Sequence, residues 1–496
     1  MIPSFSQVEA ALRRGCEAYP KPGGYTPSYG TAGYRAEASL LPSTVYRCGV
    51  LMALRSLQLG RPVGICVTAS HNPVADNGVK LVEPSGEMLA QAWEARADAL
   101  ALAATPDALV EAVRGLTSEL PGPARDPAAR ASPPDTETAP LVLIAYDTRP
   151  SSVGLAEAAR RGAAALGVPT SDLGPMTTPQ LHWAVAQTAR GLPAAPADYY
   201  AQLAGAFAEL CGGSGSDLDV EGQATLPLLV DCANGIGAPA LEALTSAVRA
   251  SRAPLDVCAF NVGKGELNGG CGADFVQKAR RLPAGFSQGP RGGAAVNGCS
   301  LDGDADRIVF WNPLGANLAA VRLLDGDRIA ALCALLCADL GAGLTAPAPS
   351  LGVVQTAYAN GASTAYITGH AAPAHTGDAV GDALSILLTV LLALQRRGWS
   401  LRDWEGLYAD LPSRQRVCRV PDRTALRTAD AERRAVAPPG LQDKIDEAVS
   451  TVSQGRAFVR PSGTEDVVRI YAEAATEAEA EALTSAIEGL IAEFLG

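Results

Sequence analysis

The feature that most constrains the fold is a buried strand followed at once by a polar loop. The apolar run 62–67 (PVGICV) predicts a strand, and 68–73 (TASHNP) follows it directly. Asn72-Pro73 is a turn signal that ends the pairing. Loops at strand exits usually carry the chemistry of an α/β sheet. Ser70 is therefore the first candidate functional residue, and a plain polar turn is the alternative of equal weight.

Ser70 lacks the G-x-S-x-G frame of the hydrolase nucleophile elbow. A hydroxyl in a tight polar loop can instead carry a phosphoryl group. Upstream, Arg35 follows two glycines and offers a planar fork suited to phosphate. Downstream, Asn77-Gly78 is a hairpin turn signal that would place Lys80 near the Ser70 loop. A surface arginine and a solvated lysine are the simpler alternatives for these two cations.

A second motif, DGDADR, places carboxylates at Asp302, Asp304 and Asp306. Their mutual repulsion needs a cation, and the small spacers let one loop turn all three inward. Hard oxygen ligands indicate Mg²⁺ or Ca²⁺. A solvated acidic turn and an aspartate-nucleophile phosphatase are the weaker alternatives.

This acidic loop is not an EF-hand. Arg307 stands where the EF-hand needs Gly, and Pro313 stands where it needs Glu. So few protein ligands leave room for waters and a phosphate oxygen, which is the coordination that Mg²⁺ prefers.

A third motif, RPSGTED at 460–466, follows a predicted strand at 457–459. The next strand, 467–471, carries Arg469, and an amphipathic helix follows at 476–494. The loop offers a guanidinium, two hydroxyls and glycine-freed amides, which together suit a phosphate dianion. A polar β-turn is the alternative.

Length and composition limit the class of protein. A chain of 496 residues is too long for one core, so three or four domains are expected. The net charge of −12 argues against nucleic acid and anionic membranes as partners, although a locally basic site can still bind an anionic substrate. Eleven cysteines without a metal-binding pattern indicate reduced thiols in the cytoplasm. We see no signal peptide, and the longest apolar run, 384–394, is too short to span a bilayer.

The strand and helix pattern divides the chain into four predicted domains. Their expected ranges are 1–190, 191–311, 312–411 and 412–496, with a flexible Pro- and Ala-rich insertion at 121–140. The third has a predicted helix at 327–344 and a strand at 351–355. It looks incomplete before the core helix that starts at 381. His370 and His375 lie in a loose segment there, and we do not interpret them as a metal pair.

The serine, cation and phosphate loops, in that order, resemble the α-D-phosphohexomutase superfamily. Within it the chain looks most like the phosphoacetylglucosamine mutases of eukaryotes. The likeness runs through nearly the whole chain and includes the segments 147–152 (DTRPSS), 177–182 (TTPQLH), 231–237 (DCANGIG), 354–361 (VQTAYANG), 430–433 (DAER) and 438–442 (PPGLQ).

The resemblance implies four domains around a central cleft: three α/β sheet domains and a smaller C-terminal α+β domain. It implies interconversion of N-acetylglucosamine 6-phosphate and 1-phosphate, on the way to UDP-N-acetylglucosamine. One Mg²⁺ and a hexose 1,6-bisphosphate, as intermediate and activator, belong to this activity. The sugar phosphate would be the partner of a monomer or weak dimer.

The resemblance also assigns roles to residues. Ser70 matches the phosphorylated serine, which with Asp302, Asp304 and Asp306 matches the Mg²⁺ ligands. Arg307 matches a position beside the phosphoserine. The remaining matches are Arg35, His71 and Lys80 near the transferring group, and Arg460, Ser462, Gly463, Thr464 and Arg469 in the clamp for the non-reacting phosphate. Lys80 and His71 both remain candidates for the group that takes the proton of the attacking hydroxyl.

The chain departs from the family between Ile367 and Gly377. The family has several dozen more residues there, including a sugar-binding loop with a Glu and an Asn, and nothing in 362–385 matches that loop. Two alternatives therefore stand beside the main prediction. One is a mutase acting on glucose or mannose phosphates, against which Tyr358-Ala359-Asn360-Gly361 argues, and the other is a truncated form with impaired catalysis.

Overall fold

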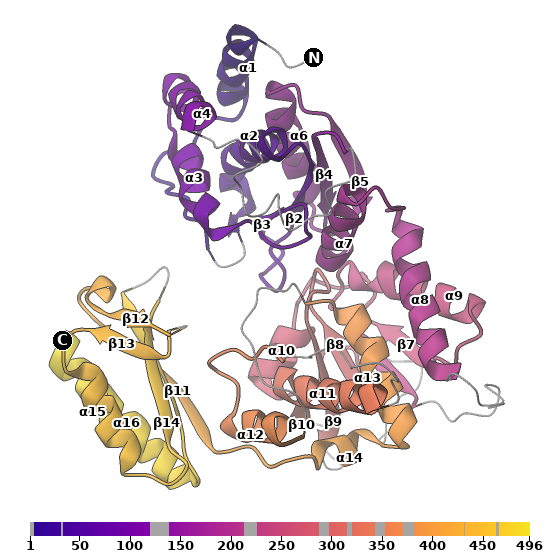
Figure 1. The fold of residues 1–496 in the computed structure, drawn as a ribbon, viewed down its shortest axis with the longest axis vertical. Coiled ribbons are helices and arrows are strands. Elements are labelled where there is room, and N and C mark those ends of the chain that lie inside the picture. Colours follow the sequence, from indigo (N-terminus) through magenta and orange to yellow (C-terminus); the bar gives the residue numbers. More distant parts are fainter. Residues whose placement is uncertain are drawn as a thin grey trace. The chain divides into compact units, whose positions relative to one another are not determined.

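Figure 1 shows the computed structural model of the chain. It describes residues 4–30, 33–119, 138–212, 226–286, 297–314, 320–342, 353–370, 381–430, 432–462 and 466–496. Contacts between residues divide the chain into two compact units. Unit 1 contains Met1–Asp325 and Asp378–Leu401, and unit 2 contains Gly326–Gly377 and Arg402–Gly496.

The first sheet of unit 1 has five strands in the order β1-β3-β2-β4-β5. Strands β2, β4 and β5 are parallel, and β3 pairs antiparallel with both β2 and β1. The strands are β1 (Tyr34–Glu37), β2 (Pro62–Val67), β3 (Asp76–Val82), β4 (Leu141–Tyr146) and β5 (Thr170–Pro175).

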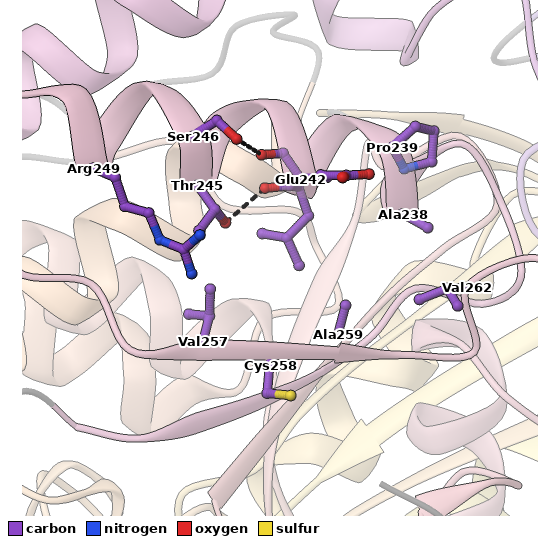
Figure 2. A pocket seen from close by; sticks show the side chains of 11 residues that line it. Ala238, Pro239, Glu242, Thr245, Ser246, Arg249, Val257, Cys258, Ala259 and Val262 are labelled. Atoms are coloured by element: carbon purple, nitrogen blue, oxygen red, sulfur yellow. Dashed lines mark hydrogen bonds between the residues drawn. The ribbon is translucent and has the colours of Figure 1, made fainter. Parts of the chain in front are cut away.

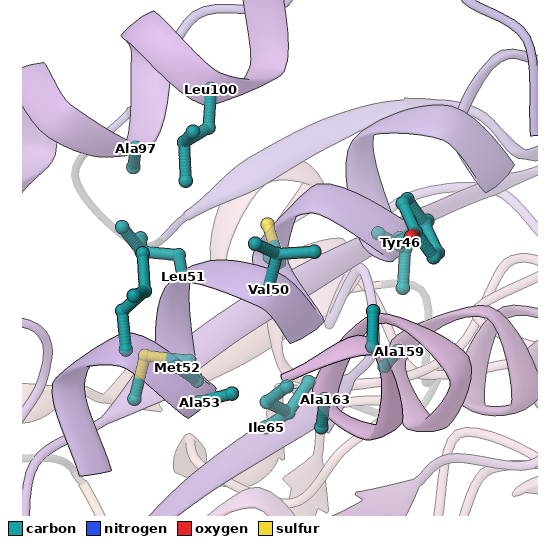
Figure 3. Packing of buried hydrophobic residues seen from close by; sticks show 14 of the residues in the cluster. Tyr46, Val50, Leu51, Met52, Ala53, Ile65, Ala97, Leu100, Ala159 and Ala163 are labelled. Carbon is teal, nitrogen blue, oxygen red and sulfur yellow. The ribbon is translucent and has the colours of Figure 1, made fainter. Parts of the chain in front are cut away.

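Helices cover both faces of the first sheet. The large core lies on one face, where Val63, Ile65 and Val67 of β2 meet α1, α2, α3, α4 and α6. Cys66 points to the opposite face and packs under α7 with Leu181. Figure 3 shows side chains of α2, α3 and α6 packing in the large core. The helices are α1 (Phe5–Ala18), α2 (Pro42–Leu59), α3 (Gln91–Leu102), α4 (Pro106–Glu119), α6 (Ser152–Ala165) and α7 (Thr178–Ala189), with the short 3₁₀ helix η1 (Ala38–Leu40).

The second sheet of unit 1 has the order β10-β9-β8-β6-β7. β6 is parallel to β7 and β8, whereas β9 is antiparallel to β8 and β10. Its strands are β6 (Leu228–Asp231), β7 (Val257–Phe260), β8 (Asn297–Leu301), β9 (Ile308–Leu314) and β10 (Ala320–Leu324). Its helices are α8 (Pro196–Gly212), α9 (Gly237–Ala250), α10 (Ala273–Ala279) and α13 (Ala383–Arg397).

Unit 2 contains an antiparallel sheet in the order β11-β15-β14 and a separate two-stranded sheet, β12-β13. α15 and α16 pack on the β11-β15-β14 sheet through Leu441, Ile445, Leu483 and Ile487. The strands are β11 (Ser413–Arg419), β12 (Arg427–Ala429), β13 (Arg434–Ala437), β14 (Arg456–Pro461) and β15 (Val467–Glu473). The helices are α11 (Gly326–Ala342), α12 (Gly361–His370), α14 (Leu401–Glu405), η5 (Arg423–Ala425), α15 (Leu441–Ser450) and α16 (Glu477–Leu495).

Two elements within the predicted third domain, 312–411, belong to unit 1 of the structure. β10 pairs with β9 and buries Val321 in the core of the second sheet, so this sheet continues to residue 324. α13 also belongs to unit 1, where the Tyr199 hydroxyl of α8 donates to Asp382 at 2.6 Å. Of the strand predicted at 351–355, Val353 forms an isolated β-bridge and Val354 and Gln355 are in no strand, whereas 351 and 352 lie outside the described residues. The expected domain boundaries stay predictions.

One local prediction in the first domain was wrong. Asn77-Gly78 is not a hairpin turn but part of β3, where it pairs with Arg35 and Ala36 of β1. Gly78 is needed for close packing, since a Cβ there would lie 2.5 Å from the Tyr34 carbonyl oxygen. Farther along the chain, α3 and α4 are separate helices, because the chain turns between Ala103 and Thr105.

Two further regions complete the description of the fold. The predicted insertion 121–140 lies outside the described residues up to 137, and His375 lies outside them as well. In the part of the chain that the structure describes, we find no helix with both the length and the apolar character needed to cross a bilayer.

Candidate active site

Ser70 lies in the loop that leaves β2, at the carboxyl end of that strand. Its backbone adopts the left-handed conformation, with φ of +53°, which is uncommon for a residue other than glycine. The side chain is only 1% exposed. Its backbone N–H donates to the Thr68 hydroxyl at 3.0 Å. The loop therefore presents one buried hydroxyl in a strained, well-defined conformation.

The Ser70 hydroxyl contacts the acidic motif directly. It donates to Asp302 Oδ2 at 2.7 Å and accepts from Arg307 Nη2 at 3.0 Å. Asp302 Oδ1 accepts from the backbone N–H groups of Asp306 and Arg307, at 3.1 Å each. The serine loop and the acidic loop, 232 residues apart in sequence, thus meet at one hydroxyl.

The three aspartates converge in the turn between β8 and β9. One carboxylate oxygen from each of Asp302, Asp304 and Asp306 lies within 4.8 Å of those from the other two. Asp302 and Asp304 are buried, and Asp306 is partly exposed. Gly303, which has no side chain, lets this turn approach the Ser70 carbonyl closely.

Lys80 reaches the same cluster from β3. Its ammonium donates to Asp304 Oδ2 and Asp306 Oδ2, both at 2.7 Å, and the residue is 3% exposed. Thr178, at the start of α7, donates its hydroxyl to Asp304 Oδ2 at 2.6 Å. Lys80 therefore lies at the Ser70 loop as expected, although it arrives along a strand and not through a turn.

The pKa values of Asp302 and Asp304 shift in opposite directions. Burial, followed by repulsion from Asp306 and Asp304, raises the pKa of Asp302 well above its usual range. Burial also disfavours ionisation of Asp304, but the Lys80 ammonium outweighs it and lowers the pKa of that carboxyl. Burial alone would lower the pKa of Lys80, but the nearby Asp304 and Asp306 carboxylates outweigh burial, so the pKa is raised above its usual value.

The aspartate cluster is suited to a small divalent cation. Asp304 Oδ1 and Asp306 Oδ1 are buried, and neither has a hydrogen-bond partner among the described residues. Such buried oxygens are costly unless something binds them, and oxygen donors are those that Mg²⁺ prefers. The residues present therefore fit the metal predicted from the sequence.

His71 and Arg307 form a contact beside the serine. Arg307 Nη2 donates to His71 Nδ1. Burial, together with the charge of Arg307, lowers the pKa of His71 to about 4. The imidazole is therefore neutral at pH 7, and since its Nδ1 accepts a hydrogen bond, the ring proton is on Nε2.

Arg35 lies on β1, opposite Gly78 of β3, with an exposed side chain. Its positive charge contributes to lowering the pKa of His71. The structure thus places Arg35 within electrostatic reach of the site, and its guanidinium remains accessible to an anion.

The predicted phosphate clamp lies in unit 2. Arg460 of β14 is directly opposite Arg469 of β15, and its guanidinium forms an ion pair with Glu432 at 3.0 Å. Ser462 is buried, and its backbone N–H donates to the Val467 carbonyl at 2.9 Å. Gly463 and Thr464 lie outside the described residues.

Sequence reasoning missed two residues that hold the serine loop. Arg149 Nη2 donates to the carbonyls of Ser70 and Asn72, at 3.0 Å each, and Asn268 Nδ2 donates to the same two carbonyls at 2.9 and 3.2 Å. In the DTRPSS segment the Ser151 side chain forms no cap hydrogen bond with α6, and Asp147 forms an ion pair with Arg149 at 3.1 Å. The sequence signal that could have identified Arg149 is the position of its segment directly after β4, where functional loops of α/β sheets lie.

A separate hollow of about 580 Å³ lies between α9 and β7. Figure 2 shows Arg249 of α9 pointing toward Val257 of β7, whereas the Glu242 side chain extends toward Ala238 and Pro239. None of the predicted site residues lines it, so this hollow is distinct from the cluster at Ser70.

Models of known families match four successive parts of the chain. "Phosphoglucomutase/phosphomannomutase, alpha/beta/alpha domain I" matches residues 30–105 and 127–195, and the C-terminal domain of the same group matches 418–490. "Phosphoacetylglucosamine mutase AMG1", domains II and III, match 190–309 and 325–377. The fold and the site thus define a four-domain phosphohexomutase, which confirms the predicted fold class.

Similar proteins narrow this class. Phosphoacetylglucosamine mutase of Arabidopsis thaliana is 39% identical, with 98% of this chain and 99% of that protein covered. Aspergillus fumigatus N-acetylphosphoglucosamine mutase, solved with GlcNAc-6P and magnesium, is 34% identical over 99% of each chain, with a TM-score of 0.82. A serine-to-alanine variant of that enzyme, solved with glucose 1,6-bisphosphate, is 35% identical over 98% of this chain and 99% of that one, with a TM-score of 0.80. The chain belongs to the phosphoacetylglucosamine mutase family.

The relatives also bear on the length of this chain. The alignment with the Arabidopsis protein spans 569 positions against the 496 residues present here, a difference of 73. That relative therefore has residues without a counterpart in this chain. Their predicted location between Ile367 and Gly377 stays a prediction, and residues 371–380 lie outside the described part of the structure.

Proposed function

We propose that this chain interconverts N-acetylglucosamine 6-phosphate and N-acetylglucosamine 1-phosphate by way of a phosphorylated Ser70. The observation that carries the proposal is the buried Ser70 hydroxyl, which contacts both Asp302 and Arg307. The names of the relatives, and the sugar phosphate in the Aspergillus complex, support the same reaction.

The reaction consists of two phosphoryl transfers. In the first, the P–O bond to Ser70 Oγ breaks and the phosphoryl group forms a new P–O bond with the free sugar hydroxyl, giving a 1,6-bisphosphate. The hydroxyl loses its proton, and Ser70 Oγ regains one. In the second, the P–O bond between the sugar oxygen and the other phosphoryl group breaks, and that group forms a new P–O bond with Ser70 Oγ. The Ser70 hydroxyl loses its proton, the sugar oxygen gains one, and the phosphorylated enzyme is regenerated. The bisphosphate bound to the Aspergillus relative is the same kind of molecule as this intermediate.

Asp302, Asp304 and Asp306 would hold Mg²⁺, together with an oxygen on Ser70. When bound, the ion neutralises negative charge on the transferring phosphoryl group. The magnesium in the Aspergillus complex supports this assignment, and so do the two carboxylate oxygens here that have no hydrogen-bond partner among the described residues.

The cations around Ser70 serve the charge of the same group. Arg307 donates to Ser70 Oγ and would also donate to the oxygens of a phosphoryl group on that atom. Lys80 stays protonated because the Asp304 and Asp306 carboxylates raise its pKa. Of the two candidates for the proton acceptor, Lys80 is protonated, whereas His71 is neutral and its Nδ1 already accepts a hydrogen bond from Arg307. In a loose transition state for phosphoryl transfer, the attacking hydroxyl loses its proton late, so charge neutralisation contributes more than a strong base.

Binding of the sugar phosphate at its non-reacting end is assigned to unit 2. Arg460, Ser462, Gly463, Thr464 and Arg469 would bind that phosphate, and Arg35 would approach the transferring group from unit 1. The paired register of Arg460 and Arg469 supports the clamp, since it places two guanidinium groups on one face of the sheet. We also propose a cytoplasmic monomer or weak dimer, consistent with eleven free cysteines.

N-acetylglucosamine phosphates are favoured over glucose and mannose phosphates. The models that match residues 190–309 and 325–377 are specific to phosphoacetylglucosamine mutases, whereas the first and last domains match the wider group. An impaired truncated form is the remaining alternative, because the predicted loss of the sugar-binding loop would remove groups that orient the sugar.

Turnover measured by phosphorus NMR tests the proposal. Purified protein is mixed with Mg²⁺, N-acetylglucosamine 6-phosphate and a trace of glucose 1,6-bisphosphate, with glucose 6-phosphate and mannose 6-phosphate as parallel substrates. We expect the 1-phosphate of N-acetylglucosamine to appear fastest and Ser70→Ala to abolish it. A folded, Ser70-phosphorylated protein that gives no product from any of the three would contradict the proposal and favour the impaired form.

A further inference from the structure

We propose that Asn268 is a positioning residue for phosphoryl transfer, which holds the Ser70 carbonyl and so directs the Ser70 hydroxyl. This inference rests on the proposed function. Asn268 lies between β7 and α10, on the second sheet, whereas Ser70 follows β2 of the first. Its side chain is therefore a link between the sheet that carries the acidic loop and the loop that carries the serine.

The backbone conformation of Ser70 needs outside support. The left-handed backbone conformation is unfavourable for a serine relative to the right-handed one. Four side-chain hydrogen bonds oppose this cost: Arg149 and Asn268 each donate to the carbonyls of both Ser70 and Asn72. Each carbonyl thus has both of its acceptor positions filled by side chains. Removing one donor leaves a buried carbonyl half satisfied and lets the peptide rotate.

Rotation of that peptide would redirect the nucleophile. The Ser70 carbonyl carbon and Cβ are both bonded to one Cα, so a change in the φ of Ser70 moves the carbonyl and also swings Oγ away from Asp302 and Arg307. In-line transfer needs the reacting atoms aligned within a fraction of an ångström, and a shift of about 1 Å can cost on the order of 100-fold in rate. Asn268 would thus affect the transfer step without touching the substrate.

Asn268 is itself firmly placed. Its backbone N–H donates to the Ala233 carbonyl at 2.9 Å, and its φ is +59°, a conformation that asparagine tolerates. Farther along the same loop, the Gly272 N–H donates to the buried Asp231 carboxylate at 2.7 Å. The loop that contains Asn268 is therefore held by the end of β6 and the segment after it, and this fixes where the Asn268 amide lies.

The test measures how fast Ser70 becomes phosphorylated. The unphosphorylated full-length protein is mixed with Mg²⁺ and glucose 1,6-bisphosphate labelled in its phosphates, and labelled protein is followed in time. Asn268→Gly removes the amide, adds no charge and fits a positive φ. Asn268→Asp keeps the shape but replaces the donor with an acceptor facing two carbonyls. We expect both variants to slow phosphorylation by about 100-fold, with melting temperatures close to wild type and the KM for the sugar phosphate within about threefold of it.

Asn234→Asp provides the matched control. Asn234 also has a positive φ, in the neighbouring loop, and its amide donates to the Glu266 carbonyl and not to Ser70. We expect this variant to be phosphorylated at the wild-type rate.

The outcomes separate the possible causes. If Asn268→Gly were phosphorylated normally, only the added charge of Asp would matter and the proposal would fail. If Asn268→Asp were normal while Asn268→Gly was slow, the role would be packing, and the proposal would fail too. A wild-type protein that could not be phosphorylated by the bisphosphate would overturn the proposed function and this inference together, whereas equal rates in wild type and both variants would overturn this inference alone.

Discussion

At the scale of single residues, Gly303 sets how closely the two functional loops approach. A Cβ at this position would lie 2.5 Å from the Ser70 carbonyl oxygen and 3.0 Å from Asn268 Nδ2. Neither atom can move freely, because the Asn268 amide donates a hydrogen bond to the Ser70 carbonyl. The absence of a side chain at 303 is therefore a condition for the contact between Asp302 and Ser70.

Gly303→Ala should consequently separate the loops and reduce turnover by at least about 100-fold, on the argument that small displacements at the reacting atoms are costly. Gly154→Ala is the matched control, since Gly154 lies in α6 with nothing within 4 Å of an added Cβ. That control should keep full turnover and gain roughly 0.5–1 kcal/mol of stability from helix propensity. Steady-state kinetics and denaturant titration measure both effects. Normal turnover in Gly303→Ala would mean that the two loops lie farther apart than described.

At the scale of secondary-structure elements, α13 shows how a segment far along the chain completes an earlier core. Asp382 caps this helix by accepting from the N–H groups of Leu384 and Ser385, and it also accepts from the Tyr199 hydroxyl. At the other end, Arg396 donates to the Leu210 carbonyl of α8 at 3.0 Å. These contacts attach α13 to α8 at two points.

Asp382→Ala should destabilise unit 1 by about 1–3 kcal/mol, because it removes a helix cap and leaves the Tyr199 hydroxyl without this partner. Tyr199→Phe isolates the second part of the loss and should cost less. Denaturant midpoints of the three proteins, followed by circular dichroism, give the comparison. An unchanged midpoint for Asp382→Ala would argue that α13 packs elsewhere.

At the scale of the whole molecule, the predicted chemistry is divided between two units. Ser70, His71, Lys80 and the three aspartates all belong to unit 1, whereas Arg460, Ser462 and Arg469 belong to unit 2. Metal binding and clamping of the distant phosphate should therefore be separable experimentally.

Mg²⁺ should raise the melting transition of unit 1 and leave that of unit 2 unchanged, since a ligand stabilises the unit that binds it, by about 2.7 kcal/mol at 100 times its Kd. Differential scanning calorimetry with and without Mg²⁺ checks this. Arg460→Ala should keep the full Mg²⁺ shift but raise the KM for the sugar phosphate, and Asp304→Asn should reduce the shift. Equal Mg²⁺ shifts in both transitions would place the metal outside the aspartate cluster.

The sequence by itself determined the types of chemistry and their order along the chain. The apolar run at 62–67 and the spacing of Asp302, Asp304 and Asp306 are local patterns, so a strand exit and a cation loop could be recognised without coordinates. Family resemblance extended this to four domains, which the family models confirm.

Only the tertiary structure decided which of these residues meet. Asn77-Gly78 reads as a turn locally, but pairing with β1 makes it a strand. Asn268 has no distinguishing local signal, and it acquires a role because the second sheet brings it to a carbonyl 198 residues away in sequence. Local patterns depend on neighbours along the chain, whereas convergence on Ser70 depends on how two sheets pack, and that is a property of the folded chain.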